Sequence, residues 1–171
     1  MFELKPITSA AVPRAIAKAE RYRLLNEPQE AESICLDILR VDPDNQEVLT
    51  MLLLAVTDQF GKSPDVSMDQ ANRVLAKLRG EHERAYYAGI IRERWGKAQL
   101  RGGSHPSLAT GFFLEAMEWY ATAMASSPAG NDDAILRWNA CIRFMERNPH
   151  LRSETGETAG ESGFPDGAPA R

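Results

Sequence analysis

One set of residues occurs twice in the chain with the same spacing. Ala31, Cys35, Ile38 and Pro43 lie at relative positions 0, 4, 7 and 12. The second set repeats these intervals and consists of Ala116, Tyr120, Ala123 and Pro128. Residues at intervals of four and three share one face of an α-helix, and a proline ends a helix before its own position. The chain is therefore predicted to contain the second helix of a helical hairpin at least twice, which favours a fold of stacked hairpins.

Helical periodicity continues along most of the chain, and alternating strand patterns are nearly absent. An all-α fold of about seven helices is predicted, at about residues 10–25, 27–41, 45–60, 68–79, 81–95 or slightly further, 106–125 and 132–146. Residues 62–68 are expected to form a loop, and residues 101–106 a flexible connection. The inner stripe of the last helix is predicted at Ile135, Trp138, Ile142 and Met145.

Several helix ends carry recognisable capping residues. A capping box has an acceptor side chain at the N-cap and Glu or Gln three residues later. Three such pairs precede the second, third and fourth helices: Asn26 with Gln29, Asp44 with Glu47, and Ser67 with Gln70. Gly80 is expected to end the fourth helix, because glycine is favoured just after a helix C-terminus.

The chain divides into three parts by composition. Residues 1–9 are an N-terminal extension, and residues 10–149 form the helical domain. Residues 150–171 contain Phe164 as their one aromatic side chain, together with four glycines, two prolines and four acidic residues. Such a segment buries too little apolar surface to offset its ordering entropy, so a disordered acidic tail is predicted. A short recognition motif at Gly-Phe-Pro-Asp is the alternative.

Charge and hydropathy limit the location and the partners of the protein. A net charge of −4 gives no electrostatic case for nucleic acid or an acidic membrane. The longest apolar run, residues 48–56, is too short to span a bilayer, and the N-terminus has no apolar signal region. We therefore expect a cytoplasmic protein, of bacterial type, in which Cys35 and Cys141 are buried thiols rather than a disulfide.

No pattern typical of catalysis or of a cofactor is present. His82, His105 and His150 lack partners at zinc-ligand spacing, and Glu115 with Glu118 is not followed by the Glu-x-x-His of a di-iron site. No catalytic, cofactor-binding or metal-binding residue is predicted, so the protein is not expected to be an enzyme.

A basic cluster lies around Trp95 and consists of Arg92, Arg94, Lys97 and Arg101. Cations interleaved with an aromatic residue are one way to bind nucleic acid. These cations, however, crowd an expected helix C-terminus, where they complement the helix dipole, and Glu93 lies among them. Nucleic-acid binding is therefore not expected.

The doubled set resembles the second helix of a tetratricopeptide repeat, a helix–turn–helix unit of about 34 residues. Ala19 and Tyr22 fit first-helix positions, and Ala19 and Leu53 lie 34 residues apart. Gly89 and Gly96 fit small positions of a third unit. The resemblance covers residues 10–147, with three degenerate units and a capping helix, and implies a right-handed solenoid whose turns are lengthened at residues 62–68 and 97–110. A helical bundle without repeats is the alternative, since any amphipathic helix carries such stripes.

In this family the first helices of the units line a concave groove that holds a partner. The resemblance places in that groove Glu20, Arg23, Thr50, Leu54, Asp58, Tyr86, Ile90, Arg94 and, on the last helix, Asn139. Leu54, Tyr86 and Ile90 are expected as apolar anchors, and Arg23 with Arg94 as a pair that holds a carboxylate. The alternative is that Leu54 and Ile90 belong to the core.

The resemblance implies a non-enzymatic adaptor that binds a partner peptide or helix, as a monomer or a weak homo-oligomer. A cytoplasmic chaperone for a secreted or assembled protein is the second hypothesis. A small helical enzyme, or its regulatory subunit, is the third. The five-residue clamp for chaperone tails is not expected, because the matching positions carry other residue types: Ile16, Glu20, Met51, Glu83 and Tyr87.

Overall fold

The computed structural model describes residues 2–151, and these residues contain seven α-helices and two short 3-10 helices. The α-helices are α1 (Val12–Leu24), α2 (Pro28–Val41), α3 (Gln46–Asp58), α4 (Met68–Leu75), α5 (Glu81–Arg101), α6 (Pro106–Ala125) and α7 (Asp133–Arg147). The 3-10 helices are η1 (Ser9–Ala11) and η2 (Pro149–Leu151). Within this described part there is no β-strand, which confirms the predicted all-α class.

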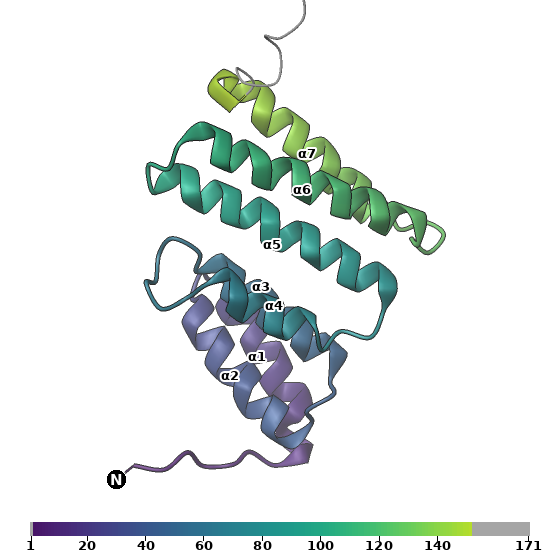
Figure 1. Ribbon diagram of the computed structural model, residues 1–171. Coiled ribbons are helices and arrows are strands. Elements are labelled where there is room, and N and C mark those ends of the chain that lie inside the picture. The colour runs from purple at the N-terminus through teal and green to yellow at the C-terminus, as the bar shows by residue number, and fades with distance from the viewer. Residues whose placement is uncertain (1, 152–171) are drawn as a thin grey trace, which may run out of the picture.

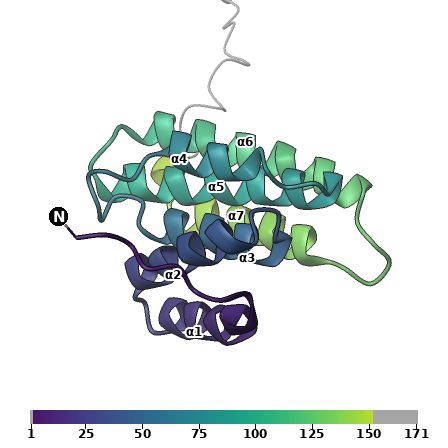
Figure 2. The same cartoon turned by 90° about the horizontal axis from the view of Figure 1, so that it is seen from below.

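Successive helices run antiparallel and pack side by side (Figure 1). Helices α1 to α4 form the N-terminal half of the molecule, and α5 to α7 stack next to one another in the other half (Figures 1 and 2). Alternate helices also touch, since α1 contacts α3 and α3 contacts α5. Helices α1 and α3 therefore each pack against the second helix of their own hairpin and against the first helix of the next hairpin.

Two apolar clusters form the core. The first joins side chains of α1 to α4 with Ile91 and Ala98 of α5, and the second joins α5, α6 and α7. Helix α5 contributes to both clusters, so it connects the two halves. The helical residues of the doubled set lie within the core, each with no exposed surface: Ala31, Cys35, Ile38, Ala116, Tyr120 and Ala123. Their predicted packing role is confirmed.

Gly89 of α5 packs directly against the Tyr120 ring of α6. A Cβ atom at this position would lie 2.4 Å from Cε1 of Tyr120, so no side chain fits there without displacing the ring. A Cβ atom on Gly96 would lie 3.2 Å from the Cβ of Phe112. Small residues at these positions therefore set the distance between the two helices.

Asn26 ends α1 and does not cap α2, which corrects the sequence prediction. Its φ is +61°, and the backbone N–H groups of Glu27 and Asn26 donate to the carbonyls of Tyr22 and Arg23. This pair of hydrogen bonds is the Schellman arrangement, in which a left-handed residue follows the helix. Asparagine tolerates that conformation, and its side chain therefore makes no cap for α2.

The other predicted caps had mixed outcomes. The Ser67 side chain accepts from the Gln70 N–H at the start of α4, as predicted. Helix α3 is capped by Asn45, whose Oδ1 accepts from the Val48 N–H, rather than by Asp44. Helix α4 ends at Leu75, so Gly80 does not end it; Gly80 is the N-cap of α5.

Helix α5 continues to Arg101, whereas its end was predicted at residue 95 or slightly further. Helix α6 begins at Pro106, so residues 102–105 are the whole connection. The extra residues at 97–110 therefore lengthen two helices rather than a turn. This extension carries Lys97 and Arg101 onto the same helix as Arg94.

The buried face of α7 agrees only in part with the predicted stripe, of which Trp138 and Met145 pack against the second cluster. Ala134 and Cys141 are its buried residues, whereas Ile135 is 43% exposed, and Trp138, Ile142 and Met145 are half-buried. Ala134 and Cys141 belong to the second cluster, so small residues of α7 face the core.

The helical domain continues through η2. Leu151 is 3% exposed, and its carbonyl accepts a hydrogen bond of 2.9 Å from Oγ1 of Thr110. The predicted acidic tail, from residue 152 onward, lies outside the described residues. Between residues 2 and 151, no helix combines the length and the apolar character needed to cross a bilayer.

Candidate functional site

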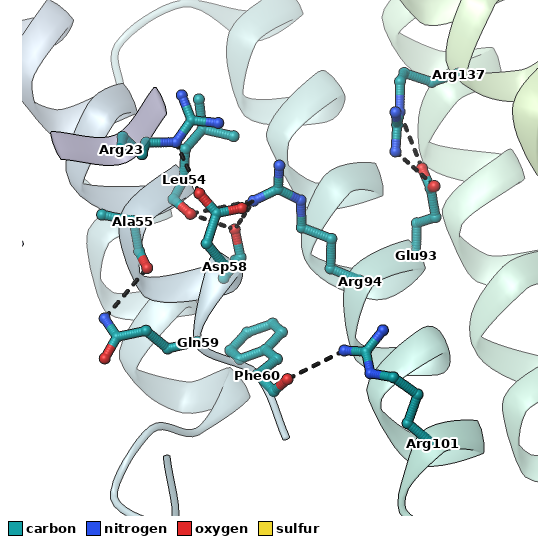
Figure 3. Close-up of polar contacts among 11 residues, drawn as sticks. Arg23, Leu54, Ala55, Asp58, Gln59, Phe60, Glu93, Arg94, Arg101 and Arg137 are labelled. Atoms are coloured by element: carbon teal, nitrogen blue, oxygen red, sulfur yellow. Dashed lines mark hydrogen bonds and ion pairs between the residues drawn. The ribbon is translucent and has the colours of Figure 1, made fainter. Parts of the chain in front are cut away.

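Ion pairs connect α1, α3 and α5 along one face of the molecule (Figure 3). Nε of Arg23 lies 2.8 Å from Oδ2 of Asp58, and Nη1 of Arg94 lies 2.6 Å from Oδ1 of the same carboxylate. The same Arg94 nitrogen donates to Oγ1 of Thr57 at 2.7 Å and to the Leu54 carbonyl at 3.1 Å. Arg23 and Arg94 are thus held in place from two sides of the last turn of α3.

The predicted arginine pair therefore holds a carboxylate, but it is that of Asp58 in the same chain. All three side chains are about one quarter exposed. Burial lowers the pKa of Arg94, and Asp58 opposes that shift. The pair still faces solvent, so a second anion could approach it, but the nearest positive charge is already partly neutralised.

A second ionic network lies between α5, α6 and α7, around Glu93. The Glu93 carboxylate has no exposed surface and accepts from Arg137 at 2.5 and 3.0 Å, from Lys97 at 2.6 Å, and from the Tyr120 hydroxyl at 2.8 Å. Burial alone would raise the pKa of Glu93, but Arg137 and Lys97 outweigh it and hold the pKa below its usual value. Glu93 is therefore ionised, and it holds the Lys97 ammonium and the Arg137 guanidinium in place.

A pocket of about 340 Å³ opens between the two networks, at the C-terminal ends of α3 and α5. Its lining is Thr57, Asp58, Lys62, Arg94, Lys97 and Arg101. Basic side chains dominate this lining, and Asp58 is its one acidic residue, so we name it the basic pocket. Arg101 donates to the Phe60 carbonyl at 3.2 Å, which holds its side chain over the pocket (Figure 3).

The N-terminal half of α5 carries an aromatic patch on this side. The rings of Tyr86 and Tyr87 pack edge to face at 5.1 Å, and both are half-buried. Thr50 of α3 lies near Tyr87, and burial is the main cause that raises the pKa of both tyrosines. The patch offers partly exposed rings with polar hydroxyl groups, a combination suited to contact with another chain.

Most of the predicted partner-binding residues lie together. Arg23, Leu54 and Arg94 meet at Asp58, while Thr50 and Tyr86 lie at the aromatic patch. Leu54 was predicted either as an apolar anchor for a partner or as a core residue. It is half-buried and packs against the second cluster, so it has features of both.

Two of the predicted residues do not join this face. Ile90 is 3% exposed and belongs to the second cluster, so the core alternative is correct and Ile90 offers no surface to a partner. Asn139 is half-buried on α7 and follows Arg137 by two residues. Two residues correspond to about 200° around a helix, so Asn139 points away from the side on which Arg137 meets Glu93.

The sequence prediction missed Lys62, Lys97, Arg101, Glu93 and Arg137. A signal for part of this set was present, because Arg94, Lys97 and Arg101 have the 0, 3 and 7 spacing of one helical face. These cations were instead interpreted as complementing the dipole at a helix C-terminus near Trp95. Nothing in the local sequence marked Glu93, whose partners Tyr120 and Arg137 lie 27 and 44 residues away.

The cysteines and the possible metal ligands form no reactive site in the described chain. Cys35 and Cys141 are both buried, and burial is the main cause that raises their thiol pKa values to about 12. Among residues 2–151, no group of three or more His, Cys, Asp or Glu side chains is placed to hold a metal ion.

Comparisons with protein-family models, with curated proteins and with solved structures give no match to this chain. Its class is therefore defined by its own geometry: an all-helical protein with a basic pocket and an aromatic patch on one side. The function is argued from that side.

Proposed function

We propose that the chain is a non-enzymatic protein-interaction module of the tetratricopeptide type. In this proposal the helices form a right-handed solenoid, and α1, α3, α5 and α7 line a concave groove that holds a peptide or helix of a partner. The contacts between alternate helices, α1 with α3 and α3 with α5, support this arrangement. The burial of the doubled residue set supports it further, because those positions are the hairpin contacts that the repeat requires.

The main observation behind the proposal is that the aromatic patch and the basic pocket lie on the same side of the molecule. The aromatic patch supplies Tyr86 and Tyr87, which are partly exposed and can bury further against a partner. The basic pocket supplies Arg94, Lys97 and Arg101 toward the other end of the same helix. Apolar anchors surrounded by oriented charges are the usual composition of a specific binding surface.

The groove residues are also held in position before a partner arrives. Asp58 holds Arg23 and Arg94, Glu93 holds Lys97, and the Phe60 carbonyl holds Arg101. Side chains that are already ordered lose less conformational entropy on binding. A surface prepared in this way favours recognition of a partner without a chemical step.

The proposal can be tested with a random peptide library displayed on phage and selected on the immobilised full chain. Selected peptides are synthesised, and their Kd is measured for the native chain, for Tyr86→Ala and for Trp119→Ala. Trp119 is the matched control, because it is a partly exposed aromatic residue, 41% accessible, on the even-numbered helix α6.

Tyr86→Ala is expected to weaken peptide binding by about tenfold or more, and Trp119→Ala to leave it within about twofold. Circular dichroism of each variant checks that the helical content is unchanged. Peptides that bind Tyr86→Ala as tightly as the native chain, but that lose affinity for Trp119→Ala, would place the binding surface on the opposite side and refute the proposal.

A further inference from the structure

The basic pocket has a charge opposite to that of the chain as a whole. The protein carries 24 acidic and 20 basic residues, for a net charge of −4. The pocket gathers Lys62, Arg94, Lys97 and Arg101 around a single carboxylate, that of Asp58. Lys62 and Arg101 are exposed, so their charges are available to a ligand. This local excess of positive charge attracts an acidic segment.

The described part of the chain ends on the same side of the molecule as this pocket (Figure 1). Leu151 is anchored to Thr110, near the start of α6, and α6 follows Arg101 after the short connection at residues 102–105. On α7, the ring of Phe144 lies 5.2 Å from Nζ of Lys97. Figure 1 shows the loop after α3, the connection between α5 and α6, and the end of α7 on the same side of the molecule.

The residues that follow are acidic. Between Arg152 and Asp166 the acidic residues are Glu154, Glu157, Glu161 and Asp166, and Arg152 is the one basic residue. An extended chain covers at most about 3.6 Å per residue, so a dozen residues span roughly 40 Å. That reach exceeds the diameter of several packed helices. A tethered segment also has an effective concentration on the order of millimolar at nearby sites.

We propose that the acidic residues between Glu154 and Asp166 bind the basic pocket of their own chain. The carboxylates pair with Lys62 and Arg101, the exposed cations of the pocket, which Asp58 does not contact directly. This inference goes beyond the proposed function and needs no partner. If a partner also uses the pocket, it must displace this segment, so the segment lowers the apparent affinity of the module.

The test is paramagnetic relaxation enhancement by NMR on the full chain. Ser162→Cys carries a nitroxide label within the acidic segment. The native cysteines are expected to stay unlabelled, because both are buried and burial raises their thiol pKa values to about 12. The label is expected to broaden the amide signals of residues 61–62 and 97–101. Amides near Arg14 and Lys18, on the exposed side of α1, are the reference and should stay sharp.

Charge variants then separate specific pairing from mere proximity. Lys62→Gln with Arg101→Gln should reduce the broadening at least about threefold, and about 0.5 M salt should do the same by screening. Arg14→Gln with Lys18→Gln is the matched control, because it removes the same charge from two exposed residues elsewhere. This control should leave the broadening unchanged.

A second variant removes the acidic charges themselves, with Glu154, Glu157 and Glu161 changed to Gln and Asp166 to Asn. It should bind a groove-selected acidic peptide at least about threefold more tightly than the native chain does, because no internal competitor remains. Pocket amides that stay sharp in the labelled chain, or broadening that survives both salt and the pocket variant, would overturn the inference. Neither result affects the proposed function, whose test is the Tyr86→Ala measurement.

Discussion

Gly89→Ala is the sharpest test of how α5 and α6 pack. In an exposed helix this change stabilises the protein by about 0.5–1 kcal/mol, because glycine loses more backbone entropy on folding than alanine. At Gly89, however, the new Cβ would lie 2.4 Å from Cε1, 2.7 Å from Cδ1 and 2.9 Å from Cζ of Tyr120. These distances are far below van der Waals contact, so the ring or the helix must move.

The structure allows the magnitude to be worked out. Tyr120 has no exposed surface, and its hydroxyl donates to the buried Glu93 carboxylate at 2.8 Å. Overpacking of this kind costs about 1–3 kcal/mol. A shift of the ring also weakens a hydrogen bond to a charged group, which contributes about 1.5–3 kcal/mol. After the helix-propensity gain is subtracted, Gly89→Ala should lower the free energy of unfolding by about 1.5–5.5 kcal/mol.

Gly111→Ala is the matched control, because Gly111 lies within α6 and a Cβ there meets no atom within 4 Å. Thermal and urea unfolding followed by circular dichroism measure both variants. Gly111→Ala should raise Tm by about 1–4 °C, and Gly89→Ala should lower it by at least about 3 °C. If both variants are stabilised to the same extent, α5 and α6 do not approach at Gly89, and the packing argument is wrong.

Three further predictions follow from burial and charge. The pKa of Glu93 is lower in the folded protein, so its stabilisation is present above the unfolded pKa of about 4.3 and is lost as pH falls through the folded value. Urea unfolding at several pH values should therefore show that the free energy of unfolding of Glu93→Gln depends less on pH in the acid range than that of the native chain. At pH 7 this variant should have a free energy of unfolding lower by roughly 1.5–3 kcal/mol. An unchanged dependence on acid pH would contradict this. Cys35 and Cys141 should not react with a thiol reagent at pH 8 unless denaturant is added, and rapid labelling of the native protein would show that their burial is wrong. Ile90→Asp should lose about 3–5 kcal/mol because it buries an unpaired charge, whereas Tyr86→Ala should keep its helical circular dichroism signal; a well-folded Ile90→Asp would return that residue to the surface.

The helices themselves were largely predictable from the sequence. The range 106–125 for α6 agrees with the structure at both ends, and the loop before Met68 and the Ser67 cap are also confirmed. These features depend on contacts within a few residues, such as a proline at a helix start or a hydroxyl that accepts from the third N–H along. Local patterns therefore suffice to predict them.

Errors arose where one residue type serves two local structures. Asparagine can cap a helix start or adopt the left-handed conformation after a helix end, and at Asn26 the structure has the second. Glycine is likewise suited to either end, and Gly80 precedes α5 rather than following α4. The choice depends on where the neighbouring helix packs, which short-range sequence does not contain.

The candidate site was predictable in part. The resemblance predicted that Arg23, Leu54 and Arg94 lie near one another, and the structure brings them together at Asp58. The assignment of Ile90 to the core was not predictable, because a stripe of apolar residues has the same pattern whether a partner or another helix covers it.

The amino-acid sequence by itself determined that this protein is helical, where most of its helices lie, and which small residues face a neighbouring helix. These properties come from the helical period of 3.6 residues and from local hydrogen bonds, so a window of about 15 residues is enough to recognise them. Only the tertiary structure decided that Glu93 is buried among Arg137, Lys97 and Tyr120, and that Lys62 joins Arg101 at one pocket. The physical reason is that charge pairing and burial depend on distance in space, and these residues are brought together by the packing of helices that lie far apart along the chain.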